Sequence, residues 1–143
     1  MRAGSGPRRL FVDSGAWIAL FSRRDQYHPD ADAGFTRAVA ESVTLLTTDL
    51  VLAEVHRFLL FRAGIRPALR ALETIAATPE LAMAYVTAET DAAAKAWLTR
   101  LDDQAISYTD ATSFAVIETT GCDAVFGFDH DFEIAGFTLW RPR

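Results

Sequence analysis

Short apolar runs along the chain alternate with longer stretches in which apolar residues recur at helical spacing. The short runs predict strands at 10–12, 43–47, 81–86, 124–126 and 137–139. The longer stretches predict helices at 16–21, 29–41, 50–63, 67–78, 87–101 and 107–120. Strands that alternate with helices are typical of a parallel sheet with helices on both faces. The pattern therefore predicts an α/β fold with a central parallel sheet of about five strands.

Residues with known turn and capping preferences mark the ends of several of these helices. Pro29 and Pro67 suit the first turn of a helix. Either Thr48 or Asp49 can cap the long helix that follows, and Gly64 ends it. The boundaries of the predicted elements therefore have a local chemical basis.

Acidic residues directly follow two of the predicted strands. Ligands of such sheets bind beyond the carboxyl ends of the strands, near the point where the strand order reverses. Asp13 follows the first strand, and Asp129 and Asp131 follow the fourth. Asp13 could instead cap the turn at Ser14, and the later pair could be solvated loop charges. These positions are therefore the first candidates for a binding site.

Two further acids lie on predicted helices. Glu54 falls on or beside the apolar stripe of its helix, where a charge needs a partner, and Arg57 could provide an ordinary ion pair. Asp110 opens a helix that either Ser107 or Thr109 caps. The Ser-x-x-Asp arrangement also resembles a capping box, so its local sequence does not separate a cap from a ligand.

The joint placement of these acids indicates a metal site more strongly than any one of them does. Clustered carboxylates repel one another strongly in a pocket of low dielectric constant, and a hard cation relieves that repulsion. Ligation by oxygen alone suits Mg²⁺ or Mn²⁺. We therefore predict a metal-binding and catalytic set of Asp13, Glu54, Asp110 and Asp129, with Asp131 either supporting these ligands or sharing the role of Asp129.

The motifs that carry these acids resemble those of the PIN domain, and in particular the VapC-type toxins of bacterial toxin–antitoxin pairs. The resemblance covers residues 10–141 and rests on four segments in order: LFVDS at 10–14, LAEV at 52–55, SYTDA at 107–111 and FDHDF at 128–132. One departure is Gly127, where members of the family often carry Thr or Ser.

This resemblance implies a three-layer α/β/α sandwich and a metal-dependent endoribonuclease. Asp13, Glu54, Asp110 and Asp129 would hold one or two Mg²⁺ or Mn²⁺ ions, and an activated water would hydrolyse RNA such as tRNA or rRNA. The resemblance also implies inhibition by an antitoxin encoded beside the toxin, and a homodimer. Two alternatives remain open: a PIN-like RNA-processing nuclease without an antitoxin, and a non-catalytic PIN-like binding module whose acids are helix caps.

Composition places these elements in a single domain. The 143 residues are half apolar with an ordinary charged fraction, which indicates a globular domain at 10–143 after a flexible lead-in at 1–9. No apolar run is long enough to cross a bilayer. The lone cysteine, Cys122, excludes an internal disulfide and fits the cytoplasm.

The net charge of the chain bears on how it could bind RNA. A net charge of −5 disfavours binding of nucleic acid by bulk electrostatics. Individual arginines could contact the RNA backbone, and the alternative for each one alone is an ordinary surface charge. The candidates are Arg9, Arg23, Arg24, Arg57 and Arg62. Trp17 and Phe61 are expected in the core or in an antitoxin groove. The apolar stretch at 50–72 could supply both an antitoxin surface and a dimer surface.

Overall fold

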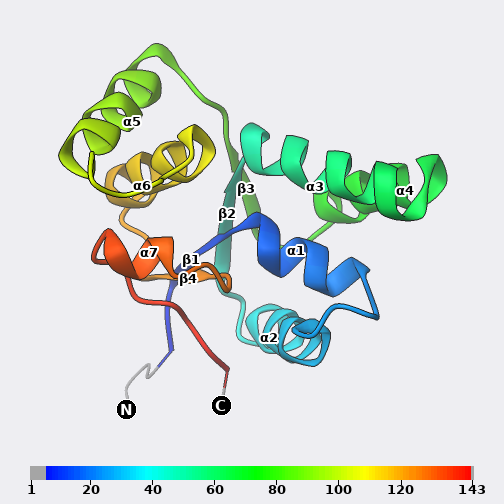
Figure 1. Cartoon of the computed structure of the whole chain (residues 1–143). Coiled ribbons are helices and arrows are strands. Elements are labelled where there is room, and N and C mark those ends of the chain that lie inside the picture. Colours follow the sequence, from blue (N-terminus) through cyan, green and yellow to red (C-terminus); the bar gives the residue numbers. More distant parts are fainter. Residues whose placement is uncertain (1–5, 143) are drawn as a thin grey trace.

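The computed structural model describes residues 6–142, and a parallel sheet lies at its centre (Figure 1). The α/β class is confirmed. In the order β3-β2-β1-β4, the described strands are β1 (Arg9–Val12), β2 (Thr44–Thr48), β3 (Leu81–Ala84) and β4 (Ala124–Phe126). Phe11 of β1 is paired with Leu46 on one side and with Val125 on the other. β1 is therefore an interior strand, buried between β2 and β4.

Pairs of helices connect successive strands. The described helices are α1 (Ser14–Phe21), α2 (His28–Ala40), α3 (Asp49–Ala63), α4 (Ile65–Ala76), α5 (Ala88–Arg100), α6 (Tyr108–Thr120) and α7 (Asp131–Ile134). Figure 1 shows α1 to α4 on one side of the strands and α5 to α7 on the other. This arrangement confirms the three-layer sandwich that the resemblance implied.

The order of the strands places a binding edge beside β1. From β1 through β2 to β3 the chain steps outward in one direction, and β4 then returns to the free side of β1. Because parallel crossovers are right-handed, the helices of the return connection cover the opposite face of the sheet. The strand order therefore reverses between β1 and β4, and this is where a ligand is expected to bind.

The structure resolves the alternative N-caps of α3. Thr48 is the cap, and its side chain accepts a hydrogen bond from the Val51 amide at 3.1 Å. Asp49 instead accepts a hydrogen bond from the Val86 amide at 3.1 Å, which ties α3 to the segment after β3. Both residues named from the sequence therefore fix this helix, each in a different way.

The prediction of a fifth strand at 137–139 is wrong. Within the described residues, this segment makes only an isolated parallel bridge, between Leu139 and Val125. The Phe137 ring packs 5.8 Å from the ring of Trp97 on α5, measured between centroids. β4 has only three residues, and within the described part of the chain only Val125 among them pairs with this segment, so no ladder forms. The sequence also gave no indication of α7.

The N-terminal lead-in is only partly described. Residues 1–5 of the predicted segment 1–9 lie outside the described residues. The backbone amides of Arg8 and Arg9 donate to Asp123 Oδ2 at 2.7 and 2.9 Å, and Arg9 already belongs to β1. The side chain of Asp123 thus fixes the start of the central strand.

Aromatic side chains fill both interfaces between the sheet and the helices. Trp17 is fully buried and stacks on Phe35 of α2 at 4.7 Å between ring centroids, which confirms its placement in the core. Beside α6 and α7, the rings of Phe114 and Phe132 meet edge to face at 5.3 Å. The ends of the strands are therefore packed against aromatic rings on both faces of the sheet.

Gly34 of α2 allows the helix to lie against Phe126, so we predict that Gly34→Ala destabilises the fold. A Cβ at this position would lie 2.9 Å from Phe126 Cε1 and closer still to Cζ. Alanine normally stabilises a helix by about 1 kcal/mol relative to glycine, but overpacking a core costs roughly 1–3 kcal/mol. We expect a net decrease in the free energy of unfolding, measured by urea titration with circular dichroism.

Gly15→Ala is the matched control for this experiment. Gly15 is also helical, but its Cβ would lie 3.8 Å from Phe128 Cδ2, an ordinary contact distance. This variant should be as stable as the wild type or slightly more stable. If Gly34→Ala behaved in the same way, the Phe126 ring would have room to turn aside and the packing argument would fail.

Candidate active site

Asp13 is held at the end of β1 by hydrogen bonds of the backbone. Its amide donates to the carbonyl oxygen of Phe126 at 3.0 Å, and Thr47 Oγ1 donates to the carbonyl oxygen of Val12 at 3.0 Å. Asp13 occupies the N-cap position of α1, but its side chain makes no capping hydrogen bond. The helix-cap alternative is therefore reduced to the effect of the Ser14 and Gly15 amides at the start of α1, which lower the pKa of Asp13 without a capping hydrogen bond.

The carboxyl group of Asp13 is buried and incompletely paired. The residue is 3% exposed, and Oδ1 has no hydrogen-bond partner among the described residues. Burial, with a contribution from the charges of Glu54 and Asp129, raises the pKa of Asp13 to about 7, although the Ser14 and Gly15 amides lower it. An unpaired buried carboxylate is costly, so this residue has the chemistry of a cation ligand.

Asp110 faces the same centre from the first turn of α6. Ser107, and not Thr109, is the N-cap, and its hydroxyl oxygen accepts a hydrogen bond from the Asp110 amide at 3.0 Å. Among the described residues the Asp110 side chain makes no return bond of the capping-box type. Burial, together with the charges of four carboxylates, raises its pKa to about 8; the four are Asp13, Asp129, Glu54 and Asp131.

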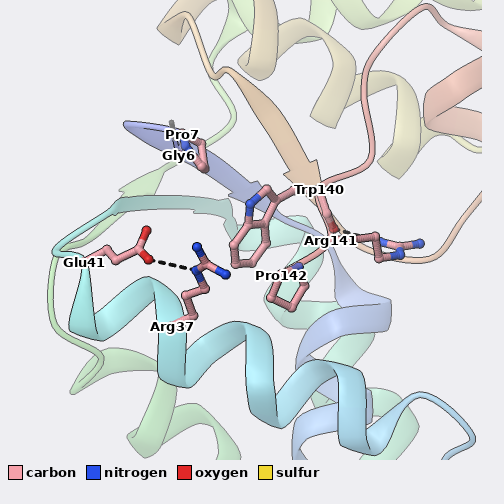
Figure 2. Close-up of a pocket in the computed structure, with 7 residues that line it drawn as sticks. All are labelled: Gly6, Pro7, Arg37, Glu41, Trp140, Arg141 and Pro142. Atoms are coloured by element: carbon pink, nitrogen blue, oxygen red, sulfur yellow. Dashed lines mark hydrogen bonds and ion pairs between the residues drawn. The ribbon is translucent and has the colours of Figure 1, made fainter. Parts of the chain in front are cut away.

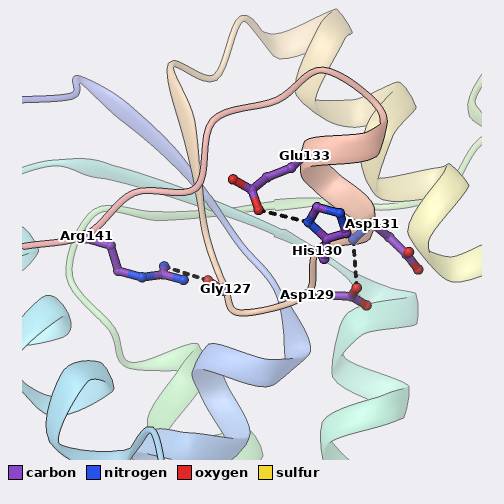
Figure 3. A network of polar contacts seen from close by, with 6 residues as sticks. All are labelled: Gly127, Asp129, His130, Asp131, Glu133 and Arg141. Carbon is purple, nitrogen blue, oxygen red and sulfur yellow. Dashed lines mark hydrogen bonds and ion pairs between the residues drawn. The ribbon is translucent and has the colours of Figure 1, made fainter.

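The loop after β4 supplies two more carboxylates (Figure 3). Asp129 Oδ1 accepts a hydrogen bond from the Asp131 amide at 2.9 Å, which shapes the turn into α7. One carboxylate oxygen each from Asp110, Asp129 and Asp131 lies within 4.8 Å of the other two. Burial and the neighbouring Asp129 raise the pKa of Asp131. Asp131 is thus placed at the centre together with Asp129, and not at its periphery.

Glu54 reaches the centre from α3 and is half-buried. Its charge raises the pKa of both Asp13 and Asp110, which places it electrostatically among them. Within the described part of the chain it forms no ion pair with Arg57, whose guanidinium lies 5.1 Å from the centroid of the Phe61 ring. The alternative for Glu54, an ordinary surface ion pair with Arg57, is therefore not observed.

Gly127 allows β4 to approach Asp13 closely. A Cβ at Gly127 would lie 3.0 Å from Asp13 Cβ, so a Thr or Ser would crowd the carboxylate unless one of them shifted. The departure from the family pattern thus has a packing explanation. The Gly127 carbonyl accepts a hydrogen bond from Arg141 Nη1 at 2.8 Å. Sequence reasoning missed this contact and that of Thr47, because both join residues from separate segments.

A parallel sheet with carboxylates gathered where its strand order reverses is the arrangement of the PIN domain. The PIN domain matches residues 10–137, and this chain belongs to that family. Among curated proteins, it is similar to the 23S rRNA-specific endonuclease VapC20 of Mycobacterium tuberculosis. The two are 35% identical over 134 residues, which cover 94% of this chain and 99% of VapC20.

Solved structures agree with this assignment. The crystal structure of Mycobacterium tuberculosis VapC20, described as a sarcin-ricin loop cleaving toxin, has a TM-score of 0.82 and 36% identity, and the match covers 93% of this chain and 99% of that one. VapBC2 from Rickettsia felis, bound to a DNA fragment from its promoter, has a TM-score of 0.72 at 12% identity, covering 92% and 97%. The latter likeness concerns the fold alone. The resemblance to PIN domains and VapC-type toxins is confirmed.

The raised pKa values predict that the metal-free protein loses stability as the pH rises from about 4 to about 8. The pKa is about 7 for Asp13 and about 8 for Asp110, against an ordinary value of 3.8. In this interval the folded state binds more protons than the unfolded state, so the free energy of unfolding falls with pH. Urea titrations in EDTA at a series of pH values measure this slope.

The contribution of Asp13 is isolated by comparison with Asp13→Asn. This variant should show a shallower slope, while Asp103→Asn, in the exposed loop after α5, should keep the wild-type slope. A tenfold change in proton affinity corresponds to about 1.4 kcal/mol, so the difference is within the reach of the method. Identical slopes for the wild type and Asp13→Asn would rule out the raised pKa.

Proposed function

We propose that this chain is a metal-dependent endoribonuclease that acts as the toxin of a toxin–antitoxin pair. The observation that carries the proposal is the buried Oδ1 atom of Asp13. It has no hydrogen-bond partner within residues 6–142, and the charges of Glu54 and Asp129 raise the pKa of this carboxyl group. Such a group is costly to bury without a cation. The similarity to a 23S rRNA-specific endonuclease over nearly the whole chain makes 23S rRNA, and its sarcin-ricin loop, the preferred substrate over tRNA.

The donor set fits Mg²⁺ or Mn²⁺. Every candidate ligand is a carboxylate oxygen, and such ions bind oxygen at about 2.1 Å, which separates opposed ligand atoms by about 4.2 Å. The present separation of at most 4.8 Å among Asp110, Asp129 and Asp131 is close to this value. We assign Asp13 and Asp110 as direct ligands, and Glu54 and Asp129 as ligands that bind directly or through water. Asp131 shares the role of Asp129, because it belongs to the same close group as Asp110 and Asp129.

Such an ion supplies a Lewis acid that offsets the charge of the scissile phosphate and makes an attacking water easier to deprotonate. The chain itself contributes positioning. Asp13 is fixed by the ladder of β1 and β4, and Asp110 by the capped first turn of α6. We assign to Ser14, beside Asp13, and to Thr109, beside Asp110, the orientation of waters or carboxylates. Rigid carboxylates need little reorganisation as charge develops on the phosphate.

A groove beside Glu54 provides a surface for the antitoxin. It has a volume of about 440 Å³ and is lined by Ser14, Ile18, Glu54, Arg57, Phe58, Phe61 and Arg62. Phe61 is 71% exposed, so its placement in the core is wrong and the groove alternative is retained. The guanidinium of Arg62 lies 4.8 Å from the centroid of the Phe58 ring. Aromatic rings flanked by arginines suit an amphipathic segment with acidic residues, whose presence beside Glu54 would block the RNA.

The apolar surface continues from the groove along α4. Ile65 is 74% exposed and Leu69 is 48% exposed. We assign the homodimer contact to this continuation. The groove favours a toxin with an antitoxin over an RNA-processing nuclease without one. Among the described residues, no helix is long and apolar enough to cross a membrane. We place the protein in the cytoplasm, where its proposed substrate is found.

The proposed function predicts that Asp110→Asn abolishes RNA cleavage. The purified chain, free of antitoxin, is incubated with 23S rRNA and tRNA in Mg²⁺, Mn²⁺ or EDTA. Discrete fragments should form only with metal. Loss of an outer partner of a metal ligand costs roughly 10- to 100-fold, so loss of a direct ligand should lower kcat/KM by more than about 100-fold.

Asp103→Asn is the matched control and should cleave like the wild type. Mn²⁺ should also raise the melting temperature of the wild type and of Asp103→Asn, but much less that of Asp110→Asn. No cleavage combined with no thermal response to metal would refute the enzymatic proposal. That result would favour the non-catalytic binding module.

The groove predicts that Phe61→Ser weakens inhibition by the antitoxin encoded beside the toxin. A buried aromatic anchor commonly contributes enough that its loss weakens binding by more than about tenfold. The antitoxin concentration for half inhibition of RNA cleavage should therefore rise by at least this factor. Tyr85→Ser, also at an exposed aromatic residue but after β3, is the control. Unchanged inhibition of Phe61→Ser would exclude this groove, without bearing on cleavage itself.

A further inference from the structure

Phe128 links the active site to an aromatic surface that the proposed mechanism does not use. It immediately precedes Asp129, and its ring lies against the first turn of α1, where a Cβ at Gly15 would be 3.8 Å from Cδ2. Tyr27 stacks on it at 4.2 Å between centroids, with the two rings only 4° from parallel. The guanidinium of Arg141 lies 4.8 Å from the same ring. We refer to Tyr27, Phe128 and Arg141 as the aromatic platform.

Tyr27 is rigid and yet accessible. Its backbone amide donates to Asp25 Oδ1 at 2.8 Å, which fixes the turn between α1 and α2. Phe128 covers one face of its ring, while the residue as a whole remains 37% exposed. Within the described residues, its hydroxyl makes no hydrogen bond. A stacked, pre-positioned ring loses little entropy when a second flat group stacks on it.

Arg141 is also held in place with donors to spare. Its Nη1 atom makes both of its hydrogen bonds, to the carbonyl oxygens of Gly127 at 2.8 Å and Trp140 at 2.9 Å. Its Nε and Nη2 atoms make none among the described residues. Arg141 also lines a pocket of about 250 Å³ together with Trp140 and Arg37, and Figure 2 shows its side chain extending away from those two residues. The remaining donors therefore suit a phosphate beside the platform.

We propose that the aromatic platform binds one unstacked nucleobase of the RNA substrate, stacked on Tyr27, together with an adjacent phosphate on Arg141. This inference rests on the proposed function and names how the substrate is held. Proteins recognise RNA loops by stacking splayed bases on aromatic side chains, and they hold the backbone with arginine. Tyr27 and Arg141 both contact Phe128, the residue before Asp129. A base bound on Tyr27 therefore places neighbouring phosphates near the carboxylates.

Stacking suits the electrostatics of this protein. The carboxylate centre repels the RNA backbone, and the chain carries a net charge of −5. Attraction between π faces does not depend on net charge, so it can anchor RNA beside an acidic centre. The platform lies where α1 meets α2, whereas the groove lies where α1 meets α3. RNA and antitoxin would thus use different flanks of the same centre.

The experiment compares Tyr27→Ala, Tyr27→Phe and Tyr85→Ala in the cleavage of a sarcin-ricin-loop hairpin. Loss of one base–aromatic stack weakens binding by roughly tenfold or more. Tyr27→Ala should therefore raise KM about tenfold and leave kcat within about twofold. Tyr27→Phe, which keeps the ring, and Tyr85→Ala, at an exposed tyrosine after β3, should match the wild type.

The stacked base is identified by binding measurements in the Asp110→Asn background, where cleavage is absent. Hairpins that carry a single abasic site at successive loop positions are titrated by fluorescence anisotropy. At one position the abasic hairpin should bind weakly, and Tyr27→Ala should weaken it no further. This non-additivity marks a direct contact.

Three outcomes would overturn the platform, and each is separable from failure of the proposed function. One is an unchanged KM for Tyr27→Ala in an enzyme that cleaves and that Asp110→Asn inactivates. Another is a Tyr27→Ala variant that loses kcat and also loses the Mn²⁺-induced rise in melting temperature. The Tyr27 ring would then only support Phe128 and Asp129. The third is equal binding of all hairpins by the wild type and Tyr27→Ala, which decides the matter even if the chain cleaves no RNA.

Discussion

The burial of carboxylates at the junction of β1 and β4 is the constraint on which the rest of the structure depends. Asp13 is almost completely inaccessible, and the nearby acids only increase the cost of ionising it. Rigid surroundings are needed to keep such groups together against their mutual repulsion. The ladder at Asp13, the hydroxyl of Thr47 and the close approach of Gly127 provide this rigidity.

The packing of the two aromatic clusters offsets the free-energy cost of burying these carboxylates. Trp17 and Phe35 pack beneath the first turn of the chain after Asp13, and Phe114 and Phe132 pack beneath the helices that present Asp110 and Asp131. The apolar residues thus lie directly behind the acids on the same elements. Stability gained in the core offsets the cost of the site, as expected where function requires an unfavourable local arrangement.

Much of the fold and part of the site could be predicted from the sequence. Asp13 and Asp129 were proposed from topology, because acids after parallel strands meet at one edge. Glu54 and Asp110 could be proposed only from the joint placement of the acids, since an ion pair and a capping box also explained them when each was taken alone. The fifth strand failed because its segment pairs with β4 through a single bridge among the described residues, and no local pattern encodes the register between two distant segments. Tyr27 and Arg141 escaped notice for the same reason, as each meets Phe128 from a distant segment.

Helix α1 borders the carboxylates, the groove and the aromatic platform. Its first turn follows Asp13, its α3 side borders the groove, and the turn that follows it presents Tyr27 beside Phe128. An occupant of the groove would block the carboxylates from one side while the platform on the other side stayed open. If both assignments hold, inhibition acts through access of the phosphate to the carboxylates and not through loss of base binding. The inhibited protein would then retain a measurable, though weaker, affinity for single-stranded RNA, whereas competition for one shared surface would abolish it.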